Sequence, residues 1–255
     1  MPASRERVKR YVAIGDSQTE GLHDYHPSGE PRGWADRFAE HLAREHPGLL
    51  YANLAVRGKR VREIREVQLG PALDMRPDLA TVVGGINDVL QPGADPEAIA
   101  DELAAMYAPL AASGCTVMTC TFPLPRTGIT ARVAPALRAL NAAIRERAEH
   151  LGLLVVDCEP VEAAADLRLW AEDRIHLNPI GHERLAAAFV GTLSGEHEEW
   201  KTALPEAREV GALRFALSEA GWVLRYLVPK LIRVSRGVSS GDGRVSKRPD
   251  LRPLD

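Results

Sequence analysis

The residues with the clearest chemical potential are a serine, an aspartate and a histidine. Ser17 ends the sequence Gly15-Asp16-Ser17 directly after an apolar run, and Asp173 precedes His176 by three residues. A carboxylate at that spacing can reach the imidazole within one turn of chain, so the pair offers a base and the group that orients it. A serine hydroxyl needs such a pair to become a nucleophile. Together these residue types indicate nucleophilic catalysis.

Two further segments place glycine and asparagine just past apolar runs. Residues 53–58 read Asn-Leu-Ala-Val-Arg-Gly, and residues 84–88 read Gly-Gly-Ile-Asn-Asp. Each pattern alone has an ordinary structural explanation, because turns favour Gly and Asn and a serine can simply cap a helix. In combination, the backbone N–H of Gly58 and the side-chain amide of Asn87 are two donors for an oxyanion formed beside Ser17.

A sheet has to bring these residues together. Five short runs, apolar almost throughout, have the pattern of strands buried on both faces, over residues 10–16, 49–55, 79–84, 115–122 and 153–159. Helical patterns lie between them, over residues 33–45, 95–112, 131–151 and 179–193. The alternation predicts an α/β fold, a three-layer doubly wound (flavodoxin-like) sheet of five parallel strands with helices on both faces.

The expected strand order is 2-1-3-4-5. In that order the first strand lies between the second and the third, so the loops that carry Ser17, Gly58 and Asn87 meet at one edge of the sheet. This edge is the topological switch point, where open α/β sheets bind their ligands. The predicted fold therefore places a nucleophile and two oxyanion donors side by side.

The chain divides into four expected parts: a catalytic domain over residues 1–195, a linker over 196–205, an amphipathic helical appendage over 206–236 and a disordered basic tail over 237–255. Residues 201–255 hold 11 Lys and Arg against 6 Asp and Glu, although the whole chain has a net charge of −3. This asymmetry indicates that the last quarter is a separate element.

The appendage carries one apolar stripe at alternating steps of three and four residues. Its members are Val210, Leu213, Leu217, Ala220, Leu224, Leu227, Leu231 and Val234. Pro229 should kink or break the helix near Val228. Three interpretations stay open: packing onto the catalytic domain, self-association, or binding to an anionic membrane surface, which the Trp222 ring and nearby arginines would favour.

Composition excludes several classes of protein. A chain of 255 residues that is 45% apolar can bury a large core, and no apolar run reaches the roughly 18–20 residues of a membrane span. Aromatic residues make up 5%, which disfavours a base-stacking nucleic-acid binder.

The three cysteines, Cys115, Cys120 and Cys158, lie in apolar runs without metal-ligand spacing. The N-terminus has no apolar signal-peptide core. Together with the cysteines, this predicts a cytoplasmic protein with reduced thiols and no metal site. His182 is interpreted as a surface or helix-packing residue.

These segments carry a resemblance to a known family. The sequence resembles the SGNH (GDSL-like) hydrolases over about residues 10–194, with all four blocks present in order. The blocks are Gly15-Asp16-Ser17, residues 53–58, residues 84–88, and residues 173–176. The sequence departs from the family pattern at Gln18, where the family name has leucine. No departure touches a catalytic position.

The resemblance implies a mechanism and a set of roles. Ser17 would attack an ester carbonyl, His176 would transfer the proton, and Asp173 would hold the imidazole. The N–H groups of Ser17 and Gly58 and the amide of Asn87 would form the oxyanion hole, and no cofactor or metal would be needed.

The substrate remains open at this point. The leading expectation is a small-molecule carboxylic ester cleaved through an acyl-serine intermediate. Carbohydrate or natural-product O-acetyl esterase, thioesterase and lysophospholipase activities would use the same groups. A non-catalytic flavodoxin-like binding module is the alternative outside enzymes, and it is disfavoured because Ser17, Asn87 and His176 are all present.

Overall fold

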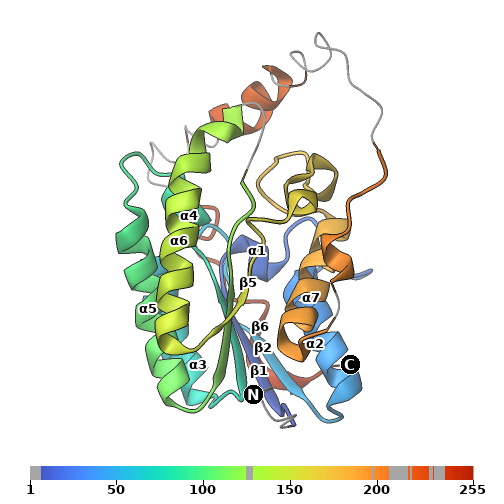
Figure 1. Ribbon diagram of the computed structural model, residues 1–255. Coiled ribbons are helices and arrows are strands. Elements are labelled where there is room, and N and C mark those ends of the chain that lie inside the picture. Colours follow the sequence, from blue (N-terminus) through green and yellow to red (C-terminus); the bar gives the residue numbers. More distant parts are fainter. Residues whose placement is uncertain are drawn as a thin grey trace.

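A six-stranded sheet forms the centre of the molecule, with strand order β5-β4-β3-β1-β2-β6 (Figure 1). The computed structural model describes residues 7–124, 129–196, 198–206, 218, 220–229, 232 and 239–254. The strands are β1 (Arg10–Gly15), β2 (Leu50–Asn53), β3 (Leu79–Val83), β4 (Thr116–Cys120), β5 (Leu154–Val156) and β6 (Arg248–Pro253). The first five are parallel, and β1 pairs with both β2 and β3. The loops after β1, β2 and β3 therefore share one edge, as the sequence predicts.

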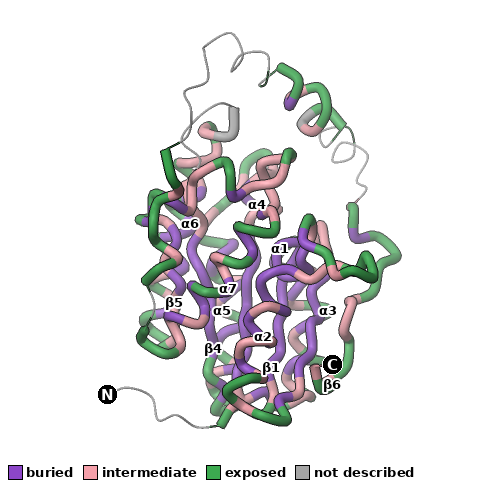
Figure 2. Tube along the Cα trace, turned by 90° about the vertical axis from the view of Figure 1, so that its right-hand side faces the viewer, coloured by how far each residue is buried: buried purple, intermediate pink, exposed green. Residues whose placement is uncertain are grey.

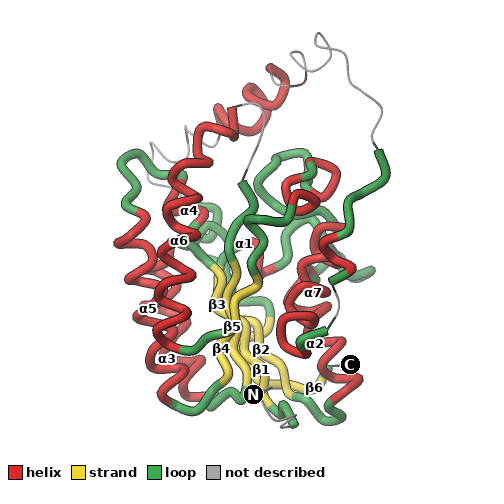
Figure 3. Tube along the Cα trace, in the orientation of Figure 1, coloured by secondary structure: helices red, strands yellow, loops and turns green. Residues whose placement is uncertain are grey.

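Helices cover both faces of this sheet and make three layers (Figure 3). The α-helices are α1 (Ser17–Glu20), α2 (Gly33–Glu45), α3 (Val61–Asp74), α4 (Ile86–Val89), α5 (Pro96–Ala112), α6 (Ala134–Leu151) and α7 (Pro179–Ser194). The 3₁₀ turns are η1 (Ile129–Val133), η2 (Glu162–Ala165), η3 (Leu167–Leu169) and η4 (Glu199–Lys201), and η5 (Val223–Leu227) is a π-helical turn. One apolar core lies under α3, α5 and α6, and a second lies under α2 and α7. Figure 2 shows the buried strands between them.

Local sequence explains where the predicted helices begin and end. Asp95 caps α5 by accepting hydrogen bonds from two backbone N–H groups, and Pro96 occupies the first turn. Gly152 ends α6 in the left-handed conformation, as its position after the periodic run predicts. Asn178 caps α7 in the same way as Asp95. This last cap matters because α7 starts directly after the segment that carries His176.

The helix α3 was not predicted from the sequence. Its buried positions are Val61, Ile64, Gln68 and Ala72, so the apolar face is narrow and one of its members is polar. Gly70 and Pro71 also lie inside the helix, and both are poor helix formers. Packing against α5 and the sheet stabilises the helix despite these residues.

The prediction of a disordered tail over residues 237–255 is wrong for residues 239–254. Arg248–Pro253 forms β6, which pairs antiparallel with β2 and extends the sheet by one strand (Figure 3). Pro249 and Pro253 in this mostly polar hexapeptide disfavour a central strand, but an edge strand pairs on one side only and tolerates them. The Arg248 guanidinium lies over the Tyr51 ring, and its Nε donates to the Tyr51 carbonyl oxygen. Side-chain contacts therefore order a segment whose sequence suggests disorder.

The appendage predicted over residues 206–236 lies partly outside the described residues. Val210, Leu213, Leu217, Leu231 and Val234 of the apolar stripe are among those not described. Among the described residues, Leu224 of the stripe is 72% exposed, whereas Trp222, beside the stripe, is only 7% exposed. The Trp222 ring, which was expected to favour a membrane surface, thus packs inward. None of the helices in the described ranges is long and apolar enough to cross a membrane.

Candidate active site

The nucleophile candidate lies where β1 ends and α1 begins. Gly15 allows a close approach there, because a Cβ atom on it would lie 2.4 Å from the Val83 carbonyl oxygen. Asp16 caps α1 by accepting a hydrogen bond from the backbone N–H of Gln18, and Ser17 is the first residue of the helix. The hydroxyl is thereby presented at the carboxyl edge of the sheet.

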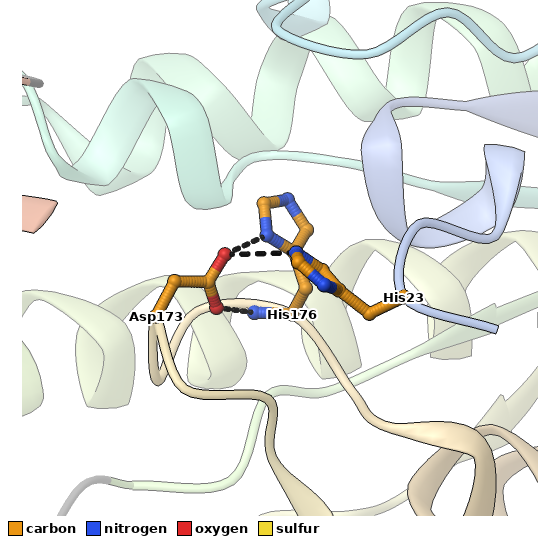
Figure 4. Close-up of side chains that lie close together, drawn as sticks. All are labelled: His23, Asp173 and His176. Carbon is orange, nitrogen blue, oxygen red and sulfur yellow. Dashed lines mark hydrogen bonds and ion pairs between the residues drawn. The ribbon is translucent and has the colours of Figure 1, made fainter.

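The structure brings the predicted triad into hydrogen-bond contact. The Ser17 Oγ lies 2.7 Å from Nε2 of His176, and Nδ1 of the same ring lies 2.6 Å from Oδ2 of Asp173. The backbone N–H groups of Ile175 and His176 both donate to Oδ1 of Asp173 at 3.0 Å. One short loop, which we call the base loop (residues 171–178), therefore supplies both the base and the carboxylate that orients it (Figure 4).

The electrostatics of the pair favour an ionised carboxylate. Burial by itself would raise the pKa of Asp173, but hydrogen bonds from the His176 ring and from two backbone N–H groups outweigh it and lower this pKa below its ordinary value. An ionised Asp173 accepts hydrogen bonds only, so Nδ1 of His176 carries its hydrogen toward the carboxylate. Nε2 is then left to accept the proton of Ser17.

The two predicted oxyanion donors lie on the loops next to the nucleophile. Nδ2 of Asn87 donates to Oδ2 of Asp16 at 3.2 Å and to the Lys59 carbonyl oxygen at 3.1 Å. Gly58 adopts the left-handed conformation, with φ of 76°, which favours glycine. The Asn87 amide is thus tied both to the residue before Ser17 and to the residue after Gly58.

Three residues that sequence reasoning missed support this edge. Gln68 on α3 binds both backbone groups of Gly15, accepting from its N–H at 2.8 Å and donating to its carbonyl at 2.9 Å. Glu20 on α1 accepts from the backbone N–H of Arg57 at 2.6 Å and pairs with its guanidinium. A polar residue on the buried face of a helix was the only available signal for Gln68. None marked Glu20.

His23 is the third missed residue. Its Nε2 lies 3.3 Å from Oδ2 of Asp173, the oxygen that also binds His176, and the two imidazole rings are 5.4 Å apart (Figure 4). Its backbone is left-handed, with φ of 65°, which is uncommon for a residue with a side chain. The ligand atoms of His23, Asp173 and His176 lie within 4.8 Å of one another, and this is the group that could hold a metal ion among the residues described.

His182 is a helix-packing residue, and the alternative of a surface position is wrong. Its side chain is fully buried on α7. The backbone N–H of Trp34 donates to Nδ1, and Nε2 donates to the Leu22 carbonyl oxygen. Burial lowers the pKa of this histidine to about 4, so the ring is neutral. It connects α7 with α2 and with the segment that follows α1.

An apolar pocket lies beside the candidate triad. Gln18 and Leu177, the chain neighbours of Ser17 and His176, are part of its lining. Most other lining residues are apolar or aromatic and come from the ends of β3 and β4 and from the segments around α7, among them Val83, Phe122, Leu169, Trp170, Leu185 and Trp200. Such a lining suits an apolar substrate group.

Comparison with solved structures supports the same fold. An alpha/beta hydrolase named LAE5 from the metagenome of Lake Arreo, Spain, is 24% identical, with a TM-score of 0.62 over 72% of this chain and 94% of that one. TesA is 22% identical, with a TM-score of 0.61 over 73% and 99% of the two chains. The acetylxylan esterase Axe2 from Geobacillus stearothermophilus is 19% identical, with a TM-score of 0.60 over 75% and 95%.

The sequence also matches a family profile. No curated protein sequence matches the chain. The profile of the GDSL-like lipase/acylhydrolase family, however, matches residues 13–184, which include Ser17, Gly58, Asn87, Asp173 and His176. Because this match spans more than half of the chain and contains the whole candidate site, the chain belongs to the GDSL-like lipase/acylhydrolase family and is a hydrolase that acts on esters.

Proposed function

We propose that this esterase works through an acyl-serine intermediate with Ser17 as nucleophile. The continuous hydrogen-bonded series from Ser17 through His176 to Asp173 carries the proposal. His176 takes the hydroxyl proton as Ser17 attacks the ester carbonyl, and it then returns that proton to the leaving alcohol. Water attacks the acyl-serine in the second half of the cycle, again with His176 as base.

The negative oxygen of the tetrahedral intermediate is assigned to three donors: the N–H groups of Ser17 and Gly58 and the amide of Asn87. The two hydrogen bonds of the Asn87 amide support this role, since they hold it next to the residue before Ser17. One of them is exchanged for a bond to the oxyanion as the intermediate forms.

The proposed substrate is an ester with a small or medium acyl group. The apolar lining of the pocket beside Gln18 and Leu177 supports an apolar acyl chain. The acetylxylan esterase among the structural neighbours keeps a carbohydrate O-acetyl ester as the second candidate. A panel of p-nitrophenyl esters from acetate to decanoate distinguishes them. Highest kcat/KM between butyrate and octanoate supports the first, and a sharp preference for acetate supports the second.

Ser17→Ala tests the nucleophile. We expect the variant to lose ester hydrolysis by about 10⁴-fold or more and to keep its fold, because the side chain is small and lies at the edge of the sheet. Rates are measured beside circular dichroism, and a fluorophosphonate probe should label the wild type and not the variant. A folded variant that retains more than about one part in a hundred of the wild-type rate would reject Ser17 as nucleophile.

No metal enters the proposed mechanism, although His23, Asp173 and His176 form a group with metal-ligand atoms. We expect EDTA to leave the rate unchanged. A rate lost to EDTA and restored by a divalent cation would contradict the proposal.

The predicted cytoplasmic location remains part of the proposal, supported by three buried cysteines with free thiols.

A further inference from the structure

The C-terminal segment contacts two loops of the candidate site, the base loop and the loop that carries Gly58, although it lies beyond the part of the chain that matches the family profile. We call it the C-terminal strap, comprising the described residues 218, 220–229, 232 and 239–254. The profile ends at residue 184. The strap therefore belongs to this chain in addition to the family core.

The first contact is with the base loop. The Trp222 ring is buried, and its Nε1–H donates to the backbone carbonyl oxygen of Asp173 at 3.0 Å. The guanidinium of Arg174, the next residue, lies 5.4 Å from the centre of the same ring. Trp222 thus binds the main chain of the residue that orients the candidate base.

The base loop needs an external support because its backbone is strained. Arg174 adopts a left-handed conformation with φ of 56°, which is uncommon for a residue with a side chain and has to be maintained by surrounding contacts. The Arg174 side chain contacts the strap at the Trp222 ring and at the Ser218 hydroxyl, which lies 3.3 Å from its guanidinium. The strained residue lies between Asp173 and His176, so its conformation sets where the imidazole points.

The second contact is with the loop that carries Gly58. The hydroxyl of Ser239 donates to the Gly58 carbonyl oxygen at 3.2 Å. Gly241 lies so close that a Cβ atom on it would be 2.1 Å from the Arg57 carbonyl oxygen. The strap therefore rests directly on the main chain of a predicted oxyanion donor.

A buried ion pair anchors the strap beyond this second contact. Nζ of Lys247 lies 2.8 Å from Oδ1 of Asp36 and donates to the carbonyl oxygens of Pro31 and Arg32 at 2.9 and 2.7 Å. Both side chains are largely buried, and six residues of β6 follow and pair with β2. The Lys247–Asp36 pair and the pairing of β6 thus anchor the turn at residues 239–241 to the sheet.

We propose that Trp222 and Ser239 are positioning residues for ester hydrolysis: Trp222 holds the Asp173–His176 loop and Ser239 holds the Gly58 loop. This inference rests on the proposed function of Ser17, His176 and Asp173. Neither residue touches the reacting atoms. Each acts through main-chain groups whose displacement would misalign the base or the oxyanion donor, and a misplacement of about 1 Å can cost on the order of 10²-fold in rate.

Trp222→Phe tests the first half, because it keeps an aromatic ring and removes the N–H donor. We expect kcat to fall roughly tenfold or more while KM stays within about twofold. A less well placed Asp173 stabilises the imidazolium less, so the acid limb of the pH–rate profile should move to lower pH. The matched control is Leu224→Ala, on the same turn of the strap but exposed, which should leave kcat, KM and the pH profile unchanged.

Ser239→Ala tests the second half independently. We expect a lower kcat with an unchanged acid limb, because the Gly58 loop is disturbed and the base is not. Thermal unfolding of every variant is measured in parallel. A fall in kcat that only follows a loss of folded protein, with no shift of the acid limb in Trp222→Phe, overturns the positioning role of Trp222. An unchanged kcat in either variant overturns the role of that residue.

The wild type separates these outcomes from failure of the proposed function. If the full-length wild type neither hydrolyses p-nitrophenyl esters nor reacts with a fluorophosphonate at Ser17, the proposed function fails. If the wild type does both and the Trp222 and Ser239 variants match it, only the role of the strap fails.

Discussion

The Asp173 carboxylate accepts more hydrogen bonds than the Asp-x-x-His spacing alone predicts. One carboxylate oxygen accepts two backbone N–H groups, and the other accepts the His176 ring at 2.6 Å while His23 lies 3.3 Å away. The two backbone bonds fix the carboxylate plane within its own loop. The imidazole is thereby held in the tautomer that can accept a proton from Ser17.

At the same scale, Asn87→Ala should lower kcat by roughly 10²–10³, or about 3–4 kcal/mol, with little change in KM. The reason is that an amide directed at developing charge acts mainly in the transition state. Steady-state kinetics on one p-nitrophenyl ester check this. An unchanged kcat with a raised KM would show that Asn87 binds substrate instead.

His182 predicts a pH dependence of stability. Its folded pKa of about 4 lies below the ordinary value of 6.5, so the unfolded chain binds the proton more tightly. The free energy of unfolding should therefore be largest above about pH 6.5 and fall as the pH drops from there to about 4. The loss is about 3 kcal/mol from this residue, which is fully buried.

His182→Gln isolates this contribution, because glutamine can still offer an acceptor and a donor but does not titrate. Urea unfolding of both proteins at pH 7 and pH 5 gives the comparison. The wild type should lose more stability than the variant between the two pH values. Equal losses would mean that protonation of His182 contributes nothing in this window.

At the scale of elements, the short helix α1 is connected to the loop after β2 by a mostly buried ion pair. Glu20 accepts from both the backbone N–H and the guanidinium of Arg57, the residue before Gly58. This pair therefore connects the helix that begins at the nucleophile with the oxyanion loop, although Gly58 lies 41 positions after Ser17.

Glu20→Gln should weaken this connection, because an amide keeps one acceptor but loses the charge. We expect kcat to fall roughly tenfold and the protein to lose about 1–3 kcal/mol, since the Arg57 guanidinium is left without its full partner. Glu66→Gln is the matched control: its pair with Arg62 is exposed and screened by solvent, so this substitution should leave stability and kcat nearly unchanged. Equal effects of the two substitutions on kcat would contradict a special role for Glu20.

At the scale of the whole molecule, the strap is part of the folded unit. A chain ending at Leu204 loses β6, Trp222 and the buried Lys247 that pairs with Asp36. We expect its unfolding midpoint to drop by roughly 10 °C, because Asp36 loses a buried partner and β2 becomes an edge strand. Differential scanning calorimetry of both chains measures the drop.

The same pair of chains tests the other two interpretations of the appendage. Exposed Leu224, Val228 and Ile232 keep self-association and membrane binding as proposals. If a full-length dimer becomes a monomer on truncation, self-association is supported. If truncation removes only salt-sensitive binding to anionic vesicles, the membrane proposal is supported. A truncated chain as stable as the full-length one would contradict packing onto the catalytic domain.

The five parallel strands, most of the covering helices and the residues of the candidate site could be predicted from the sequence. Strands buried on both faces are apolar throughout, and caps such as Asp95 and Asn178 mark helix starts, so local chemistry is enough. The spacing of Asp173 and His176 is also local, since both residues lie in one loop. The strand order placed Gly58 and Asn87 beside Ser17, whereas the contact of the Asp173–His176 pair with Ser17 was implied by the family resemblance.

The contacts of Gln68, His23, Trp222 and the strand β6 could not be predicted from the sequence and became evident in the tertiary structure. Each depends on a partner far away in the chain: Gln68 on Gly15, His23 on Asp173, and Arg248 of β6 on Tyr51. A polar side chain, or a proline-containing polar hexapeptide, carries no local pattern that distinguishes such a contact from exposure to solvent. These contacts form because the folded sheet brings distant backbone groups and rings within reach, and that proximity is a property of the fold rather than of any short segment.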